Sequence, residues 1–382
     1  MVKDYNPPAT SSHLSKGERV PKKRLIVIDS NSIVHRAFHA LPQLSTKSGE
    51  VVGAVYGFLL VFLKALRELQ PDYIAATFDL PGPTFRHEKF KEYKATRPPT
   101  AQGICEQLPK VKEILKAFNI SIFEKQGFEA DDIIATISSL VSGQRTPELE
   151  TIILSGDSDT FQLVDKNTKV YFLRKGVKDT VLYDENRVLE KYEGLCPEKL
   201  ADFKGLKGDP SDNIPGVKGI GEKTAINLIL KFGSLENLYK EVEEDKSSSP
   251  PLAAARAVKE DKSSSTPFAA ARAVKEDKSS STPFAAARAV KEDKSSSTPF
   301  AAARVIDENS ETVAEIPPRI KEILIKGKEQ AFLSKALAQA ERNAPIDFDL
   351  KECLWQKLDK EKAREIFEKF EFQSLINRLT EL

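Results

Sequence analysis

Cysteine is scarce in this chain of 382 residues. The three thiols, Cys105, Cys196 and Cys353, lie far apart and lack the spacing of a metal site, so we interpret them as reduced thiols of a cytosolic protein. No apolar run approaches the roughly 18 residues of a membrane span. The polar first 22 residues lack the apolar core of a signal peptide, and we expect a disordered lead-in over residues 1–22. These absences predict a cytoplasmic protein without a membrane partner, and we expect a monomer.

A charge excess of either sign is also missing. The chain carries 58 basic and 57 acidic residues, which gives a formal net charge of +1. Any binding to nucleic acid must therefore come from local basic patches rather than from the overall charge. With 40% hydrophobic residues, the chain can bury a sizeable core in one large domain or two ordinary ones.

Short apolar runs alternate with stretches of helical periodicity in the first 160 residues. The expected strands are Leu25–Ile28, Tyr73–Phe78, Ser121–Phe123 and Thr151–Leu154. The expected helices are Val52–Leu69, Leu108–Phe118 and Asp131–Val141. This alternation predicts an α/β fold with a mostly parallel sheet flanked by helices.

Strand signals fade further along the chain. The expected helices there are Pro197–Phe203, Glu222–Phe232, Arg319–Ile325, Glu329–Ala340 and Lys360–Phe370, and Phe348–Leu350 is a possible short strand. Between them, units of 16 residues begin at Lys246, Lys262, Lys278 and Lys294. Each unit offers too little apolar surface to offset its ordering entropy, so we expect a disordered insertion over residues 246–315.

Acidic residues follow three of the expected strands. Asp29 and Asp79 come directly after strands, and Asp157 and Asp159 come shortly after another. Because ligands of open parallel sheets bind beyond the carboxyl ends of the strands, we expect these side chains to meet at one edge.

Two further acidic groups complete the set. They are Glu129, Asp131 and Asp132 at a helix start, and Asp209 and Asp212 in a Gly-rich segment. Helix capping would explain single members, but not the whole set. Crowded carboxylates raise each other's pKa unless cations neutralise them, and Mg²⁺ or Mn²⁺ prefers such oxygen ligands. We therefore predict two divalent cations that assist the hydrolysis of a phosphodiester. His35 and His39 are interpreted as packing or surface residues rather than zinc ligands.

Two segments carry the features of nucleic-acid contacts. Thr84–Arg97 interleaves basic and aromatic residues, which suit phosphates and bases respectively, although a solvated amphipathic helix explains the same pattern. Val217–Ala225 reads VKGIGEKTA, the pattern of a helix-hairpin-helix whose glycines let backbone amides approach a phosphate. The residues expected to meet DNA are Arg86, Tyr93, Lys94, Arg97, Lys218, Gly219, Gly221, Lys223 and Thr224.

Together these motifs resemble the 5′ nuclease domain of bacterial DNA polymerase I and, more broadly, the flap endonuclease superfamily. The similar segments are LIVIDSNSIVHRAF at Leu25, TFDLPGPTFRHEKFKEYKATRPP at Thr77, GFEADDIIAT at Gly127, ILSGDSDTFQLV at Ile153 and GLKGDPSDNIPGVKGIGEKTA at Gly205. The resemblance resumes near Ile316 with KEQAFLSKALAQ at Lys328.

The resemblance implies a domain organisation. It comprises a PIN-like nuclease domain over residues 23–195 with a helical arch at about 84–107, a helix-hairpin-helix subdomain over 196–245, and a C-terminal helical part with the start of a linker over 316–382.

The resemblance also implies an activity and its residues. The activity is that of a 5′-3′ exonuclease and 5′-flap endonuclease in primer removal and DNA repair, on flaps, nicked or branched duplex and RNA-primed ends. By position, the nine acidic residues match the family's metal ligands and further acidic positions, with Asp29 and Asp159 among the catalytic ones. Lys94 and Arg97 match residues that steer the scissile phosphate, and Tyr93 matches an aromatic that stacks at the unpaired end. The hairpin is expected to hold K⁺, and a separately encoded polymerase is an expected partner, since the chain is either a stand-alone nuclease or a fragment.

Other function classes explain fewer of these residues. Asp157-Ser158-Asp159-Thr160 superficially copies the signature of haloacid-dehalogenase phosphatases, but that reading leaves Asp29 and Asp79 without a role. A non-catalytic DNA-binding scaffold would keep Lys94 and the hairpin without needing the carboxylates. An RNA-directed nuclease of the same fold stays open, because contacts to phosphates are shared between DNA and RNA.

Overall fold

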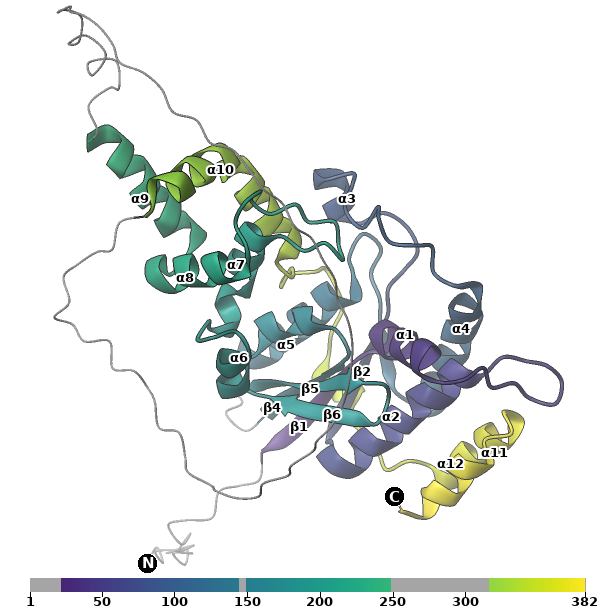
Figure 1. Cartoon of the computed structure of the whole chain (residues 1–382). Coiled ribbons are helices and arrows are strands. Elements are labelled where there is room, and N and C mark those ends of the chain that lie inside the picture. Colours follow the sequence, from purple (N-terminus) through teal and green to yellow (C-terminus); the bar gives the residue numbers. More distant parts are fainter. Residues whose placement is uncertain (1–21, 144–148, 249–315, 382) are drawn as a thin grey trace, which may run out of the picture. The chain divides into compact units, whose positions relative to one another are not determined.

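The computed structural model describes residues 22–143, 149–248 and 316–381. The predictions of a disordered lead-in and a disordered repeat insertion fall almost wholly outside these ranges, and they stay predictions. The chain divides into one unit of Met1–Asp245 with Pro318–Leu382 and a second of Lys246–Pro317. The sheet and the candidate site belong to the first unit (Figure 1).

A six-stranded sheet forms the centre of this unit, with the strand order β3-β2-β1-β4-β5-β6 (Figure 1). The strands are β1 (Lys23–Asp29), β2 (Tyr73–Thr77), β3 (Ser121–Phe123), β4 (Leu149–Ser155), β5 (Thr168–Lys175) and β6 (Asp179–Tyr183). All neighbouring strands pair in parallel except β5 and β6. Val27 of β1 lies opposite Ala75 of β2 and Ile153 of β4, so the carboxyl ends of these three strands reach the same edge. The predicted mostly parallel sheet is confirmed.

Helices cover both faces of the sheet (Figure 1). Those before β5 are α1 (Ser30–Ala40), α2 (Gly53–Leu69), α3 (Phe85–Lys89), α4 (Gln102–Ala117), α5 (Ala130–Gly143) and the 3₁₀ helix η1 (Ser158–Leu163). Those after β6 are α6 (Glu185–Lys191), η2 (Pro197–Lys199), α7 (Leu200–Lys207), α8 (Glu222–Phe232), α9 (Leu235–Ser248), α10 (Pro318–Ala338), η4 (Leu350–Cys353), α11 (Lys360–Lys369), α12 (Gln373–Arg378) and η5 (Leu379–Glu381).

The side chains of β1 alternate between two hydrophobic cores, because successive residues of a strand face opposite sides of the sheet. Ile26 and Ile28 are buried in a cluster that includes side chains of α2, α4, α11 and α12. Leu25 and Val27 are buried in a second cluster with α5. A strand covered on both faces needs apolar residues at every position, which explains the uninterrupted apolar run.

The helices α7 to α10 form the part of this unit that carries the hairpin. Helix α10 packs along α7, where the ammonium of Lys335 lies 2.7 Å from the carboxylate of Asp202. Helices α9 and α10 are joined by the rings of Tyr239 and Phe332, whose centroids are 5.4 Å apart. The chain before the repeats and the chain after them therefore belong to one helical layer. Among the described residues, no helix is long and apolar enough to cross a membrane.

Most of the predicted helices and strands are confirmed, and the exceptions have physical reasons. The two helices expected on either side of Gly327 form the single helix α10. A Cβ atom at Gly327 would lie 2.6 Å from Cγ1 of Val217, so this glycine permits close packing of the helix against the hairpin rather than ending the helix. The strand expected at Phe348–Leu350 is wrong: Asp349 caps the 3₁₀ helix η4 instead. The sequence analysis also missed β5 and β6.

Candidate active site

Eight of the nine predicted carboxylates line two hollows that share Asp157, Asp212 and Arg97. The larger hollow, of about 420 Å³, includes Asp29, Asp79, Glu129, Asp131, Asp157 and Asp212. The smaller one, of about 270 Å³, includes Asp157, Asp159, Asp209 and Asp212. The carboxylates come from the ends of β1, β2 and β4, the start of α5 and the approach to α8, so the predicted meeting at one sheet edge is observed.

Asp29 is a buried carboxylate whose position is fixed by its neighbours. Its Oδ1 accepts a hydrogen bond from the backbone N–H of Ser32 at 3.1 Å, which caps α1. Its Oδ2 accepts one from the hydroxyl of Ser155 at 2.6 Å. Burial nevertheless raises the pKa of Asp29 to about 7, with the negative charges of Asp79 and Asp157 adding to the effect. Asp29 therefore both caps a helix and carries a charge that favours a nearby cation.

Asp79 and Asp131 face the same hollow. The carboxylate of Asp79 accepts a hydrogen bond from the backbone N–H of Ala130 at 2.7 Å, which ties the end of β2 to the start of α5. Burial raises the pKa of Asp79, and it raises that of Asp131 well above the usual range. Repulsion from Asp157 and Asp29 raises the pKa of Asp131 further. A positive charge beside Asp79 and Asp131 would offset the cost of burying them in their ionised form.

Asp159 and Asp209 are joined by a lysine that the sequence analysis missed. The ammonium of Lys204, on α7, contacts Asp159 and lies 2.7 Å from Oδ2 of Asp209. Burial raises the pKa of Asp159 to about 6 even though Lys204 opposes the shift. Burial would also raise the pKa of Asp209, but Lys204 outweighs it and lowers that pKa.

Lys94 and Arg97 lie at the mouth of the larger hollow and pair with its carboxylates. The ammonium of Lys94 lies 2.6 Å from Oε1 of Glu129, and the guanidinium of Arg97 contacts Asp212. The backbone N–H of Lys94 donates to the carbonyl of Asp212 at 2.9 Å, with Lys94 at a φ of +55°. This segment is helical only at α3 and continues as turns, so it differs from a continuous amphipathic helix. The side chain of Arg97 stays 46% exposed.

Arg86 and Asp132 are a buried pair, and the structure does not support their predicted roles. Arg86 is 3% exposed and Asp132 is 0% exposed. The two guanidinium nitrogens NH1 and NH2 of Arg86 each donate to one oxygen of Asp132 at 2.7 Å. The same oxygens accept hydrogen bonds from the backbone N–H groups of Glu129 and Glu341. Arg86 therefore has no surface to offer DNA, and Asp132 has no oxygen turned toward either hollow.

Tyr93 is buried as well, so in this structure its ring is not presented for the predicted stacking at an unpaired end. Its side chain is 3% exposed, and its hydroxyl donates to Glu129 at 3.1 Å and to Asp212 at 3.3 Å. The ring meets His87 edge to face at 5.3 Å. Tyr93 thus helps to hold the carboxylates of Glu129 and Asp212 in place through its hydroxyl.

The hairpin residues that we expected to meet DNA lie together at the surface. Lys218, Gly219, Gly221 and Lys223 are exposed, and Thr224 is partly exposed on the first turn of α8. Gly219 has a φ of +97°, a conformation that glycine adopts without strain. The helix-hairpin-helix pattern is therefore realised by α7, the hairpin and α8.

The larger hollow also contains basic side chains that the sequence analysis did not assign to it. Arg36, on α1, donates to the carbonyls of Gly156 at 2.7 Å and Arg174 at 3.0 Å. His35 lines the same wall, and burial lowers its pKa, with His39 and Arg97 adding to the effect. The position of both residues about two turns after Asp29 was the available signal, because α1 begins at the site.

The carboxylates fit a divalent cation by chemistry, although their present partners are basic side chains. Within the described ranges, no three acidic, histidine or cysteine side chains are grouped as a ready cation site. Lys94, Arg97 and Lys204 instead supply the positive charge to Glu129, Asp212, Asp159 and Asp209. The donors are all carboxylate oxygens, which hard divalent cations prefer. The raised pKa values of Asp29, Asp79 and Asp131 leave further demand for positive charge.

Solved structures share this fold. The T5 D15 protein co-crystallised with metal ions aligns with a TM-score of 0.54 and 16% identity, over 91% of this chain and 99% of that one. The catalytic core of Rad2 in complex with DNA substrate aligns with a TM-score of 0.50 and 17% identity, over 92% of this chain and 89% of that one.

Related sequences identify the family. DNA polymerase I of Bacillus caldotenax is 34% identical over 94% of this chain, and that of Caldicellulosiruptor bescii is 36% identical over 93%. The chain spans about a third of the length of these relatives. Residues 24–193 match the 5′-3′ exonuclease, N-terminal resolvase-like domain, and residues 195–267 match the 5′-3′ exonuclease, C-terminal SAM fold. The chain therefore belongs to the 5′-3′ exonuclease family.

Proposed function

We propose that this protein is a divalent-metal-dependent nuclease that hydrolyses DNA phosphodiesters at 5′ ends and 5′ flaps. The observation that carries the proposal is the grouping of eight carboxylates from five separate segments around two adjoining hollows. Family membership and the metal-bound and DNA-bound neighbours support it. A role in primer removal and DNA repair would follow from such an activity.

Two divalent cations, Mg²⁺ with Mn²⁺ as a substitute, would be held by these carboxylates. We assign Asp29, Asp79, Glu129, Asp131 and Asp157 to the larger hollow, and Asp159, Asp209 and Asp212 to the smaller one. When bound, such cations supply an activated water and neutralise charge on the phosphodiester. Asp132 is left out of this assignment because its oxygens are saturated by four hydrogen bonds within the protein.

The basic residues at the mouth would receive the scissile phosphate. Lys94 and Arg97 now pair with Glu129 and Asp212, and a phosphate offers the same anionic oxygens. Divalent cations bound to Glu129 and Asp212 would compete with Lys94 and Arg97 for these carboxylates. Lys94 and Arg97 would then pair with the phosphate instead. Arg97 presents a planar guanidinium suited to two phosphate oxygens, whereas Lys94 acts as a point charge.

The hairpin would hold the duplex part of the substrate. Its exposed Lys218 and Lys223 and the open backbone at Gly221 suit contacts with phosphates. The proposal includes K⁺ at the hairpin, RNA-primed ends as substrates and a DNA polymerase as a partner. The relatives' name supports the polymerase partner, since they are DNA polymerases of about three times this length.

The test is incubation of the purified chain with 5′-labelled flap, nicked duplex and RNA–DNA substrates, with Mg²⁺ or with EDTA. We expect release of 5′ products from the flap in Mg²⁺ and none in EDTA. Asp159→Asn should lose this activity, while the matched variant Asp347→Asn, at an exposed position outside both hollows, should keep it. Cleavage that continues in EDTA, or that Asp159→Asn leaves intact, would refute the metal-dependent mechanism.

A further inference from the structure

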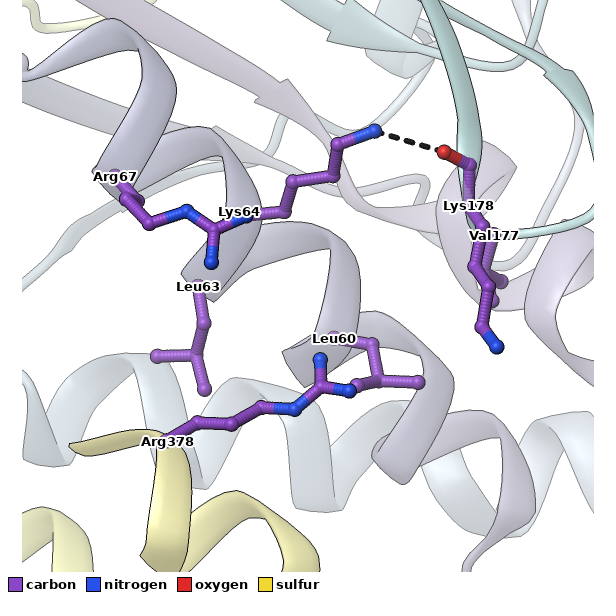
Figure 2. Close-up of a pocket in the computed structure, with 7 residues that line it drawn as sticks. All are labelled: Leu60, Leu63, Lys64, Arg67, Val177, Lys178 and Arg378. Atoms are coloured by element: carbon purple, nitrogen blue, oxygen red, sulfur yellow. Dashed lines mark hydrogen bonds between the residues drawn. The ribbon is translucent and has the colours of Figure 1, made fainter. Parts of the chain in front are cut away.

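A basic hollow lies outside the candidate active site, between α2, the β5–β6 turn and α12. It has a volume of about 330 Å³, and we call it the α2–α12 pocket. Its lining consists of the basic residues Lys64, Arg67, Lys178 and Arg378 and the apolar residues Leu60, Leu63 and Val177. Figure 2 shows the four basic side chains, which come from three separate elements, around Leu60 and Leu63. No acidic residue lines this pocket among the described residues.

One side of the α2–α12 pocket is held in place by hydrogen bonds, and two other basic side chains on its rim are exposed. The ammonium of Lys64 donates to the carbonyl of Lys178 at 2.7 Å (Figure 2). It also donates to the hydroxyl of Thr180 at 2.6 Å, and the two bonds join α2 to the β5–β6 hairpin. Glu68 lies 3.9 Å from the same ammonium. Lys178 and Arg378 are exposed, and in the described part of the chain neither forms an ion pair. These two side chains therefore have positive charge available for a ligand.

The apolar residues at the floor of the pocket restrict which ligands can fit it. Leu60, Leu63 and Val177 are 7%, 5% and 5% exposed, so the floor is part of the packed core and cannot collapse further. A ligand that suits the pocket needs anionic groups for the rim and a compact, weakly polar part for the floor. A nucleic-acid backbone alternates phosphates with sugars in this way.

The β5–β6 turn connects this pocket to the candidate active site. Arg36, which lines the active-site hollow, donates to the carbonyl of Arg174 at the end of β5. A Cβ atom at Gly176 of the turn would lie 3.7 Å from that of Ala40 on α1. Lys175, the last residue of β5, is exposed, whereas the side chain of Arg174 pairs with Asp179. The β5–β6 turn thus connects the active-site wall on α1 with the α2–α12 pocket.

We propose that the α2–α12 pocket binds the phosphodiester backbone of the DNA substrate outside the cleavage site, with Lys178 and Arg378 contacting phosphates. The proposal rests on the proposed nuclease function and adds a separate contact surface to it. The connection of the pocket to the active-site wall through the β5–β6 turn favours DNA over a small free polyanion. Lys64 acts as a positioning residue here, because its hydrogen bonds hold the turn that presents Lys178.

The test is the salt dependence of binding to a 5′-flap duplex, measured in EDTA so that no strand is cut. Each phosphate contact contributes about 0.9 to the slope of the logarithm of affinity against the logarithm of salt concentration. We therefore expect Lys178→Gln and Arg378→Gln to reduce the slope by about 0.9 each, and the double variant by about 1.8. The matched control is Lys351→Gln with Lys357→Gln, which removes the same charge from the rim of another hollow of about 430 Å³. The control should keep the wild-type slope.

Four results would overturn the proposal. An unchanged slope in a double variant that still cuts the flap in Mg²⁺ would overturn the pocket assignment alone. An equal loss of slope in the control would show that only overall charge matters. Tight binding of tripolyphosphate that the double variant abolishes, with an unchanged DNA slope, would assign the pocket to a small polyanion. A wild-type chain that neither binds nor cuts the flap would overturn this proposal and the proposed function together.

Discussion

Replacement of Asp132 by asparagine separates a structural role from a cation-binding one. Both carboxylate oxygens of Asp132 are engaged: Oδ1 accepts from NH2 of Arg86 and the N–H of Glu341, and Oδ2 accepts from NH1 of Arg86 and the N–H of Glu129. Whichever oxygen the amide nitrogen replaces, an NH₂ group then faces two donors. The guanidinium of Arg86 also loses its nearer charge partner while buried, and it keeps only the carboxylate of Glu129, at 3.4 Å.

The structure sets the size of the effect. Removal of one partner from a buried ion pair costs about 3–5 kcal/mol, because the other charge stays buried without compensation. Arg86 also donates to the carbonyls of Leu337 and Gln339, each at 2.9 Å, and these bonds partly hold the guanidinium in place. We therefore expect a loss near the middle of that range, about 4 kcal/mol. For a domain of this size class, that lowers the unfolding midpoint by roughly 8–16 °C.

Thermal unfolding in EDTA and in Mg²⁺ is the assay, with Asp159→Asn as the comparison. Asp132→Asn should lower the midpoint in both conditions and keep the stabilisation by Mg²⁺. Asp159→Asn should lose much of that stabilisation, because the pKa of Asp159 is raised by burial and its carboxylate faces the hollow. If Asp132→Asn unfolded at the wild-type temperature in EDTA and lost the Mg²⁺ effect, Asp132 would be a cation ligand and the reasoning would be wrong.

A double variant checks that the pair itself carries the effect. Arg86→Met with Asp132→Leu replaces the two charges by apolar groups of similar size, and such replacements are often neutral when nothing else is unsatisfied. Here the N–H groups of Glu129 and Glu341 would lose their acceptor, so we expect partial recovery. The double variant should be less destabilised than the sum of the two single variants, by about 2 kcal/mol. A strictly additive result would mean that the two residues do not act as a pair.

Three further outcomes follow from the same structure. Lys94→Ala should slow flap cleavage about 10²- to 10³-fold in single-turnover assays, because the charge of Lys94 acts on the reacting phosphate. The dissociation constant of the flap should rise only a few-fold. Equal losses in cleavage and binding would mean that Lys94 contributes to binding alone. Mg²⁺ at about 100 times its dissociation constant should stabilise the wild-type fold by about 2.7 kcal/mol in thermal unfolding, and no shift would argue against a cation site. Deletion of residues 246–304 should leave flap cleavage within a few-fold, because Tyr239 of α9 already packs on Phe332 of α10; loss of folding would give the repeats a structural role.

The sequence predicted the sheet edge and most of its carboxylates for one physical reason. Strands buried on both faces are uninterrupted apolar runs, so their ends are easy to locate, and parallel strands bring those ends together. Asp29, Asp79 and Asp157 could therefore be placed from the chain alone. Strand β6 was missed because all of its residues are only partly buried, and β5 was missed because polar residues such as Lys169 interrupt its buried positions.

The roles of Arg86, Tyr93 and Asp132 could not be predicted from composition and position. A basic or aromatic residue in a segment such as TFRHEKFKEYK looks exposed until its partner is known, and the partner of Arg86 lies 46 residues away. The geometry of the α-helix does, however, constrain the directions of the Asp131 and Asp132 side chains. Successive residues of an α-helix point about 100° apart, so Asp131 and Asp132 at the start of α5 point in different directions. The structure turns Asp131 toward the hollow and Asp132 into the core.

The three basic side chains that neutralise the carboxylates differ in how easily they can leave. Lys204 lies between Asp159 and Asp209 on the rigid helix α7, and its side chain is 16% exposed. Lys94 and Arg97 lie on a segment of turns, and Arg97 is 46% exposed. Exposed ion pairs are worth little and are readily exchanged, whereas a buried pair resists separation. On the proposed function, cations would therefore displace the more exposed Arg97 first, and Arg97 would then pair with the phosphate, while Lys204 would remain as a fixed charge beside Asp159 and Asp209.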